Sequence, residues 1–214
     1  SSTVKRNSGS SFSDEEKILW GEDYITEKIN ENIYKISSNS FFQTNSKQAK
    51  VLYDLIIQIA GFKGNEIVYD LYCGTGSIGL HIAKHVKMVY GIEVVMSAVI
   101  DAIENAKNNK INNIHFFHGD LINVFNSSEE LKLIPKPNIV ILDPPRAGIH
   151  ENTLNEILKF NSKKIIYVSC NPSTQARDIK LLSEHNYKIK NIQPVDMFPH
   201  TPHIENIVLM EKYE

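Results

Sequence analysis

Cysteine is scarce in this chain of 214 residues, which has only Cys73 and Cys170. Two cysteines cannot build the disulfide framework of a small secreted protein, so we expect a reducing, cytoplasmic setting in which a cysteine serves packing or chemistry. No apolar run approaches the roughly 20 residues that a membrane helix needs, and the serine-rich N-terminus lacks the apolar centre of a secretory signal. We therefore expect neither a membrane partner nor export.

A strong excess of charge is also missing, because 23 Lys and Arg residues are balanced by 25 Asp and Glu, for a net charge of −2. Nucleic-acid-binding domains are usually basic. The balance counts mildly against an RNA substrate, unless a basic surface is local or lies on a part outside this chain. The hydrophobic fraction of 42% is that of an ordinary globular protein, long enough here for one core.

The distribution of apolar residues predicts three parts. Residues 1–17 are polar and serine-rich, and we expect a flexible lead-in or the remnant of a preceding domain. Residues 18–40 predict an accessory hairpin on the main sheet, with its turn near Asn30. Residues 41–214 are expected to form the main domain.

Within the main domain, apolar spacing predicts a first helix that begins after the cap residues Thr44 and Asn45 and ends at Gly61. Short apolar strands then alternate with helices, which is typical of an α/β, doubly wound parallel sheet. Strands are expected near 66–71, 88–93, 114–118, 138–142 and 164–169, and helices near 77–85, 96–109, 151–160 and 173–185. Segments 187–195 and 204–211 have no helix between them, so we expect an antiparallel pair that closes the sheet.

The stretch NEIVYDLYCGTGSIGL, residues 65–80, is the most informative part of the chain. Asp70 ends a buried strand, and Gly74, Gly76 and Gly79 turn the chain into a helix, which allows a ligand to approach the backbone. The spacing fits the G-x-G-x-x-G of dinucleotide sites, so an NAD enzyme is one hypothesis. The acid four residues before the first glycine is instead similar to motif I of S-adenosylmethionine (SAM) methyltransferases.

We favour SAM because it has no phosphate and carries a sulfonium cation, which a nearby carboxylate suits. A tight turn that binds nothing is the structural alternative. Glu93 ends the next strand, where an acid accepts both ribose hydroxyls of a nucleotide, although a solvated carboxylate would look the same. Asp120 ends the third strand and is a candidate for the adenine amino group, with a helix cap as the alternative.

Two further strand ends carry candidates for chemistry. Asp143 opens a stiff Asp-Pro-Pro-Arg loop, in which Arg146 replaces the aromatic residue of amino-group methyltransferases and is free for a phosphate or carboxylate. Cys170 precedes a helix that starts with proline, so the helix dipole is expected to lower the thiol pKa, although a lone cysteine is more often a packing residue. Cys73, inside the glycine turn, is expected to pack or to line the cofactor pocket.

Glu205 lies in the segment HTPHIEN and is a candidate general base, with a solvated acid as the alternative. His200 and His203 precede it, but two histidines in a proline-broken loop are poorly placed to share an ion, so no metal is expected. Phe41 and Phe42 either stack on a base or pack in the core.

FFQTN, DLYCGTGSIGL, GIE, DPPRAG, SCNPST and PVDMFPHTPHIE stand in one order in this chain. Together they resemble the RNA (uracil-5-)-methyltransferase family, most of all the enzymes that act on 23S ribosomal RNA, and the resemblance covers about residues 18–212. It implies a class I SAM-dependent methyltransferase domain and SAM as cofactor, with S-adenosylhomocysteine as product. It also implies C5-methylation of uridine in RNA.

By this resemblance Cys170 is the nucleophile and Glu205 the base. The positions that contact SAM in the family are matched by Gln43, Tyr72, Glu93 and Asp143, with Ser77 and Asp120 as neighbours. Members usually carry an N-terminal RNA-binding barrel, and some bind an iron–sulfur cluster through four cysteines. Two cysteines cannot hold such a cluster, so this chain is expected to be a catalytic fragment.

Two other functions stay open at this point. One is a SAM enzyme that modifies a base amino group, and the other is a module that binds RNA or SAM without turnover.

Overall fold

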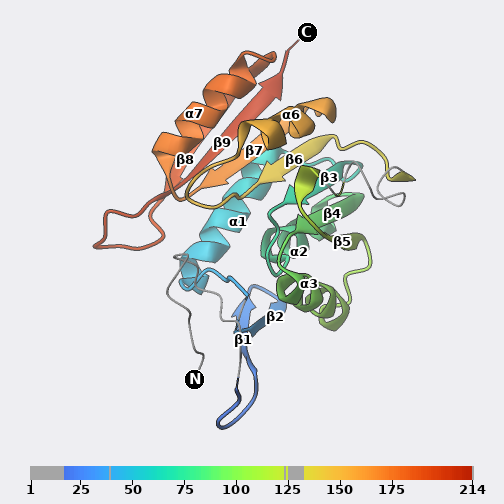
Figure 1. The fold of residues 1–214 in the computed structure, drawn as a ribbon, viewed down its shortest axis with the longest axis vertical. Coiled ribbons are helices and arrows are strands. Elements are labelled where there is room, and N and C mark those ends of the chain that lie inside the picture. The colour runs from blue at the N-terminus through green and yellow to red at the C-terminus, as the bar shows by residue number, and fades with distance from the viewer. Residues whose placement is uncertain (1–16, 39, 123, 125–132, 214) are drawn as a thin grey trace.

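A seven-stranded sheet forms the centre of the molecule in the computed structural model, which describes residues 17–38, 40–122, 124 and 133–213 (Figure 1). The strand order is β5-β4-β3-β6-β7-β9-β8. Neighbouring strands are parallel except at β9, which runs antiparallel to both β7 and β8. The strands are β3 (Ile67–Leu71), β4 (Met88–Glu93), β5 (Ile114–His118), β6 (Ile139–Leu142), β7 (Lys164–Ser169), β8 (Tyr187–Val195) and β9 (Glu205–Lys212). The predicted α/β class and the antiparallel closing pair are confirmed.

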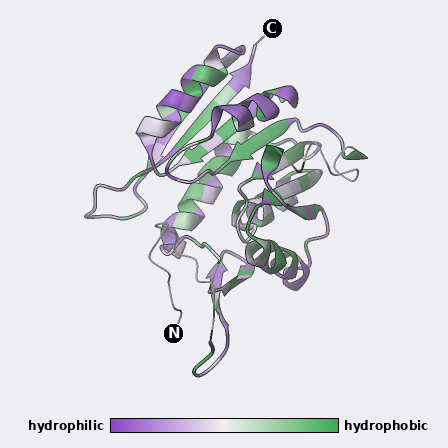
Figure 2. Cartoon of the chain, in the orientation of Figure 1, coloured by the Kyte–Doolittle hydropathy of each residue, from purple (hydrophilic) through white to green (hydrophobic). Residues whose placement is uncertain are grey.

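Helices cover both faces of this sheet, as continuous apolar strands require. Alternate residues of one strand enter different cores: Val68 packs on one face and Tyr69 on the other. Figure 2 shows the central strands as the most hydrophobic part of the chain. The helices are α1 (Ser46–Ala60), α2 (Ser77–Ile82) with the short 3-10 turn η1 (Ala83–His85), α3 (Met96–Asn108), α6 (Glu151–Lys159) and α7 (Pro172–Ser183). No helix in the described ranges is both long and apolar enough to span a membrane.

The helix ends follow the predicted signals. The Asn45 side chain accepts a hydrogen bond from the Gln48 N–H at 3.1 Å and caps α1, whose other end closes at Gly61 with φ 60°. A positive φ is easily adopted by glycine, which explains why the helix ends there. Asn171 caps α7 in the same way, with Pro172 in the first turn.

The hairpin of β1 (Tyr24–Ile29) and β2 (Asn32–Ser37) forms as predicted, but it is a separate two-stranded sheet. Within the described residues the hairpin has no strand pairing with the main sheet, and side chains from helix α3 cover the outer edge of β2. Two side chains of α3 and that of its C-cap residue bond the outward backbone of β2: Asp101 accepts from Ser37 N, Asn105 from Lys35 N, and the cap Asn109 from Ile33 N.

The spacing explains this docking. Residues four apart on a helix advance about 6 Å, and residues two apart on a strand advance about 6.6 Å, so one helix face can pair with every second strand residue. Asn105 is fully buried and bonds Lys35 with both its oxygen and its amide, at 2.6 and 3.0 Å. The Asn105 amide also lies 3.4 Å from the Thr75 carbonyl oxygen in the glycine turn.

We expect Asn105→Ala to lower the free energy of unfolding by about 2–3 kcal/mol, because it leaves buried backbone groups of β2 without partners. Urea denaturation measures the loss. Glu104→Ala on the next residue removes only a partly exposed ion pair with Lys35 and is the matched control, with a much smaller expected loss. Equal losses in both variants would contradict the role given to Asn105.

Candidate active site

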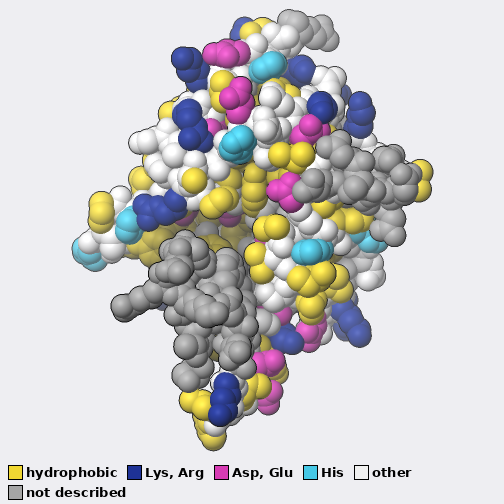
Figure 3. All heavy atoms as spheres, in the orientation of Figure 1, with side chains coloured by type: hydrophobic (Ala, Val, Ile, Leu, Met, Phe, Trp, Pro, Cys, Tyr) yellow, Lys and Arg dark blue, Asp and Glu magenta, His cyan; other side chains and the backbone are white. Residues whose placement is uncertain are grey.

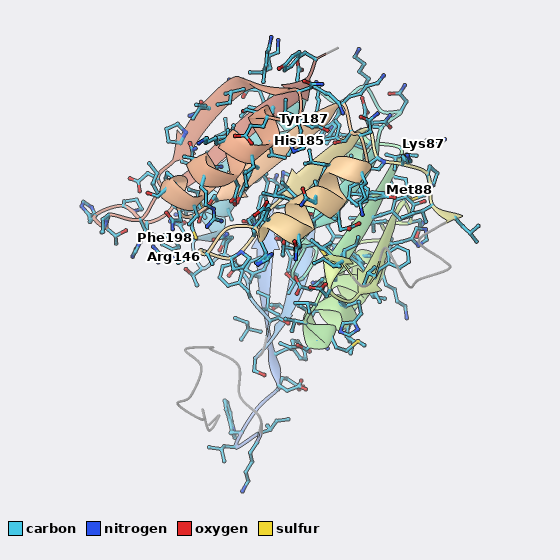
Figure 4. All side chains as sticks on the ribbon, turned by 45° about the horizontal axis from the view of Figure 1, so that its top comes forward. Lys87, Met88, Arg146, His185, Tyr187 and Phe198 are labelled. Carbon is cyan, nitrogen blue, oxygen red and sulfur yellow. The ribbon has the colours of Figure 1, made fainter. Side chains whose placement is uncertain are left out.

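The sheet brings the predicted acids and Cys170 together at the carboxyl ends of its parallel strands. The carboxyl ends of the parallel strands β4, β3, β6 and β7 meet there, and β9 starts there because it runs the other way. Ser169 pairs with Asn206, so the next residues outward in this register are Cys170 and Glu205. In chain order this edge carries Asp70, Tyr72, Glu93, Asp143, Cys170 and Glu205. In Figure 4 Arg146 and Phe198 lie at this end, and Lys87 and Met88 lie at the opposite end.

The turn after β3 has the backbone angles that its glycines predict, and one strained residue besides. Gly74 and Gly76 have φ values of 53° and 78°, and Tyr72 has φ 63°, which is unusual for a side-chain-bearing residue. Such strain costs about 1–3 kcal/mol and is found at functional sites. Gly79 has a different role, because a Cβ there would lie 2.8 Å from Asp70 Oδ2, the atom that accepts the Gly79 N–H at 2.9 Å.

The side chain of Glu93 holds two loops, the glycine turn after β3 and the segment after β4. Its Oε2 accepts from Gly74 N at 2.9 Å and its Oε1 from Val95 N at 2.8 Å. Each carboxylate oxygen has further lone pairs for a ligand. Glu93 is therefore placed both to shape the glycine turn and to accept hydroxyl groups beside it.

Two acids of the site, Asp70 and Asp143, have raised pKa values. Burial, with a contribution from the Asp143 carboxylate, raises the pKa of Asp70 to about 8, and burial raises the pKa of Asp143 to about 7. Asp70 Oδ1 is buried and has no hydrogen-bond partner in the part of the chain that the structure describes. An orphaned buried carboxylate oxygen suits a cationic ligand, which would replace the lost solvation.

The Glu205 carboxylate is close enough to influence the Cys170 thiol, and Asp143 and Arg146 influence both groups. Glu205 is 4% exposed, and its Oε2 has no partner among the described residues. Burial raises its pKa to about 8, helped by Asp143 and opposed by Arg146.

The prediction of a lowered thiol pKa is wrong for this structure. The pKa of Cys170 is raised, first by burial and then by the carboxylate of Glu205, with Arg146 acting in the opposite direction. Desolvation and nearby carboxylates disfavour a thiolate more than the helix end favours it. Cys170 stays half-buried, whereas Cys73 is buried beside Gly74, as predicted for a packing residue.

Helix α7 holds the Asp-Pro-Pro-Arg loop against the cysteine. The Arg146 carbonyl oxygen accepts from Asn171 Nδ2 at 3.0 Å and from Thr174 Oγ1 at 3.1 Å. Buried Asp178 accepts from Ile149 N at 2.8 Å at the far end of the loop. The sequence analysis missed these residues, because their role depends on partners some 30 positions away.

The side chain of Arg146 is exposed and lies near His203, with 3.4 Å between Arg146 Nη2 and His203 Nδ1. No group of three or more His, Cys, Asp or Glu residues within the described ranges is arranged to hold a metal ion. Arg146 and His203 come from two different loops, and both side chains are exposed to solvent.

The remaining candidates lie around the glycine turn. Gln43 is buried and lines a cavity of about 480 Å³ between the hairpin and the start of α1, and the Phe41 carbonyl approaches Gly74. Ser77 Oγ accepts from Tyr53 OH at 2.9 Å. Asp120 is exposed and its Oδ1 accepts from Ile122 N at 3.0 Å, as a helix cap does. Their contacts with a cofactor stay predictions.

The two adjacent phenylalanines divide between the alternatives that the sequence left open. Phe42 packs on Tyr34, with 5.4 Å between ring centroids. Phe41 is 68% exposed. Phe41 is therefore the more exposed of the two, and half-buried Phe42 also lines the cavity beside Gln43.

Comparison with known proteins decides the family. A sequence model described as tRNA (uracil-5-)-methyltransferase matches residues 10–213. The chain belongs to this family. An uncharacterized RNA methyltransferase of Chlorobaculum tepidum is 47% identical over 94% of this chain and 42% of its own length, and one of Bacteroides thetaiotaomicron is 46% identical over 91% and 42%.

Solved structures agree with this family membership. The Pyrococcus abyssi tRNA (uracil-54, C5)-methyltransferase, crystallised with S-adenosyl-L-homocysteine, matches with a TM-score of 0.78 and 34% identity, over 98% of this chain and 49% of that one. The M. jannaschii protein TYW2 in complex with S-adenosylmethionine shares the fold at a TM-score of 0.63 and 20% identity, over 92% and 90%. The chain thus spans less than half the length of these curated family relatives.

We expect Glu205→Gln to change how the stability of this family member depends on pH. The folded protein keeps the Glu205 proton up to about pH 8, whereas an unfolded glutamate loses it near pH 4. Stability from this group is therefore present at low pH and lost as pH rises toward 8. Relative to the unaltered protein, the variant should gain about 1–3 kcal/mol between pH 5 and 8.

Chemical denaturation at several pH values measures this difference. Glu31→Gln, at an exposed position in the hairpin turn, is the control. Its free energy of unfolding should change with pH in the same way as that of the unaltered protein. A constant difference between Glu205→Gln and the unaltered protein across this range would show that Glu205 is ionised throughout.

Proposed function

We propose that this chain is the catalytic part of an enzyme that transfers a methyl group from SAM to C5 of uridine in RNA. We expect 23S ribosomal RNA as the substrate. The observation that carries the proposal is the juxtaposition of Cys170 and Glu205, a half-buried thiol and a buried carboxyl at facing ends of β7 and β9. Family membership supports the same chemistry.

Cys170 is the proposed nucleophile, because C5 of uracil is too weakly nucleophilic to take a methyl group directly. The Cys170 thiolate forms a bond to C6, and the electron pair of the C5=C6 double bond moves toward the C4 carbonyl. C5 then has the character of an enolate carbon and can attack a methyl group, which is covalent catalysis. Because its pKa is raised, the half-buried Cys170 thiol must first give its proton to water, and the positive charge of Arg146 favours this loss.

SAM, when bound, supplies the methyl group and leaves as S-adenosylhomocysteine. The residues present fit such a cation, because Asp70 Oδ1 is buried and unpartnered among the described residues and Asp143 lies on the next strand. Gly74 leaves the backbone open to a ligand, because the Phe41 carbonyl oxygen, 3.8 Å from where a Cβ would stand, is its nearest neighbour there. The proposed cofactor-binding residues are Gln43, Tyr72, Ser77, Glu93, Asp120 and Asp143.

Glu205 is the proposed base that removes the C5 proton after methyl transfer. The electron pair of that C–H bond re-forms the C5=C6 double bond, the C6–S bond breaks, and Cys170 is released as thiolate. A carboxylate whose pKa is about 8 is a stronger base than an exposed one, and bases whose pKa lies near the working pH are the most effective. Burial of Glu205 thus serves the reaction.

The uridine must leave its stack to reach Cys170, so we expect a flipped base or a single-stranded loop. Figure 3 shows basic and acidic side chains interspersed over the face it presents, without one large basic surface. Tight RNA binding is therefore proposed to need parts of the longer protein, with Arg146 as a contact close to the target. The relatives are named RNA methyltransferases, and the Pyrococcus abyssi enzyme is named for tRNA.

We expect Cys170→Ala to abolish methyl transfer from labelled SAM to RNA, because no C6 adduct can form without the thiol. RNA that contains 5-fluorouridine should form a stable adduct with the unaltered protein, because fluorine at C5 cannot be removed as a proton. Denaturing gels and mass spectrometry locate the adduct on Cys170. Cys73→Ala is the matched control and should retain the adduct. Methyl transfer that survives Cys170→Ala would instead favour amino-group methylation.

The substrate is tested by mapping 5-methyluridine in cells with and without the intact gene. We expect the loss of a modified position in 23S ribosomal RNA. Loss of the modification in tRNA alone would exclude the ribosomal substrate, while the proposed C5-methylation of uridine would still hold. RNA binding with neither product nor adduct would support a module without turnover.

A further inference from the structure

The position of the Glu205 carboxylate depends on how the start of β9 is held. Its Oε2 is buried without a hydrogen-bond partner among the described residues. The six residues before it, 199–204, are exposed, so β9 begins where a surface loop ends. Strand ends that follow such loops fray readily. Glu205 pairs with Val195 of β8, and a base that must meet one proton of a bound uracil depends on every further contact that holds this end of β9.

Gln175 supplies an anchor at the adjacent residue. It lies in α7, is 1% exposed, and uses both ends of its amide. Its Nε2 donates to the Asn206 carbonyl oxygen at 3.0 Å, and its Oε1 accepts from Asn206 Nδ2 at 2.7 Å. Both the backbone and the side chain of the residue that follows Glu205 are thus held by one side chain.

The same amide also holds the strand that carries the nucleophile. Gln175 Nε2 donates to the Tyr167 carbonyl oxygen of β7 at 2.8 Å. Gln175 therefore bridges β7 and β9 just inside the ends that carry Cys170 and Glu205. Helix α7 begins two residues after Cys170, so Gln175 and the nucleophile are joined through a short rigid segment.

We propose that Gln175 is a positioning residue that sets the start of β9, and with it the carboxylate of Glu205, relative to Cys170. This inference rests on the proposed function, because it assigns a role in the step that Glu205 performs. An amide is suited to the task, since it carries no charge that would change the protonation of Glu205.

The test uses Gln175→Leu in the full-length protein, with the RNA that the unaltered protein methylates. Displacement of the base by about 1 Å can cost about 100-fold in rate, so turnover should fall by up to this factor. Addition of Cys170 and methyl transfer do not need the base. The methylated covalent adduct with ordinary uridine RNA should therefore accumulate on denaturing gels, and the adduct with 5-fluorouridine RNA should form at an unchanged rate.

A second variant guards against a failure to fold. Asn206→Ala removes only the side-chain half of the contact, at a half-buried position, and should cause a smaller accumulation of the same adduct. Ser183→Ala, at an exposed position near the end of the same helix, is the control and should leave turnover unchanged.

The outcomes separate this inference from the proposed function. If turnover and 5-fluorouridine adduct formation fall together in both variants, the role of Gln175 is merely structural and the inference is overturned. Unchanged turnover in both folded variants overturns it as well. If the unaltered protein forms no 5-fluorouridine adduct at all, the proposed function itself fails.

Discussion

The antiparallel pairing of β9 with β7 is the constraint on which the rest of the site depends. Strands that run parallel place only their carboxyl ends at the ligand edge, so a parallel β9 would carry Glu205 to the opposite end of the sheet. The observed register, with Ser169 opposite Asn206, puts Glu205 level with Cys170. Residues 35 positions apart thereby become neighbours. On its other side β9 pairs with β8, where Val195 is the partner of Glu205.

Burial of acids is the second feature that unites the site, and it has a cost. Asp70, Asp143 and Glu205 all have raised pKa values, chiefly because they are removed from water. Each would be easier to bury as an apolar residue, so the arrangement sacrifices stability for function. The proposed gain is a pocket that favours a cation beside Asp70 and a base of raised strength at Glu205. The backbone of the glycine turn, strained at Tyr72, adds to this local cost.

Most of the fold could be predicted from the sequence, because periodicity and caps are local signals. The spacing after Gly61 predicted the five strands from β3 to β7 and the helices α2, α3, α6 and α7 to within a few residues. The hairpin was predicted as a pair of strands, but its docking against helix α3 was not predicted. Its edge is covered by Asp101, Asn105 and Asn109 of α3, and polar residues on a helix face look like a solvated surface until the partner strand is known.

The sequence by itself determined the class of fold, the glycine turn and the identities of the candidate nucleophile and base, because motifs carry residue types in a fixed order. Only the tertiary structure decided the electrostatics. The raised thiol pKa of Cys170 follows from its burial and from Glu205, which the sequence places in another segment. The structure alone also revealed the Gln175–Asn206 contact. Burial and long-range hydrogen bonds arise from how distant segments pack, so no local pattern encodes them.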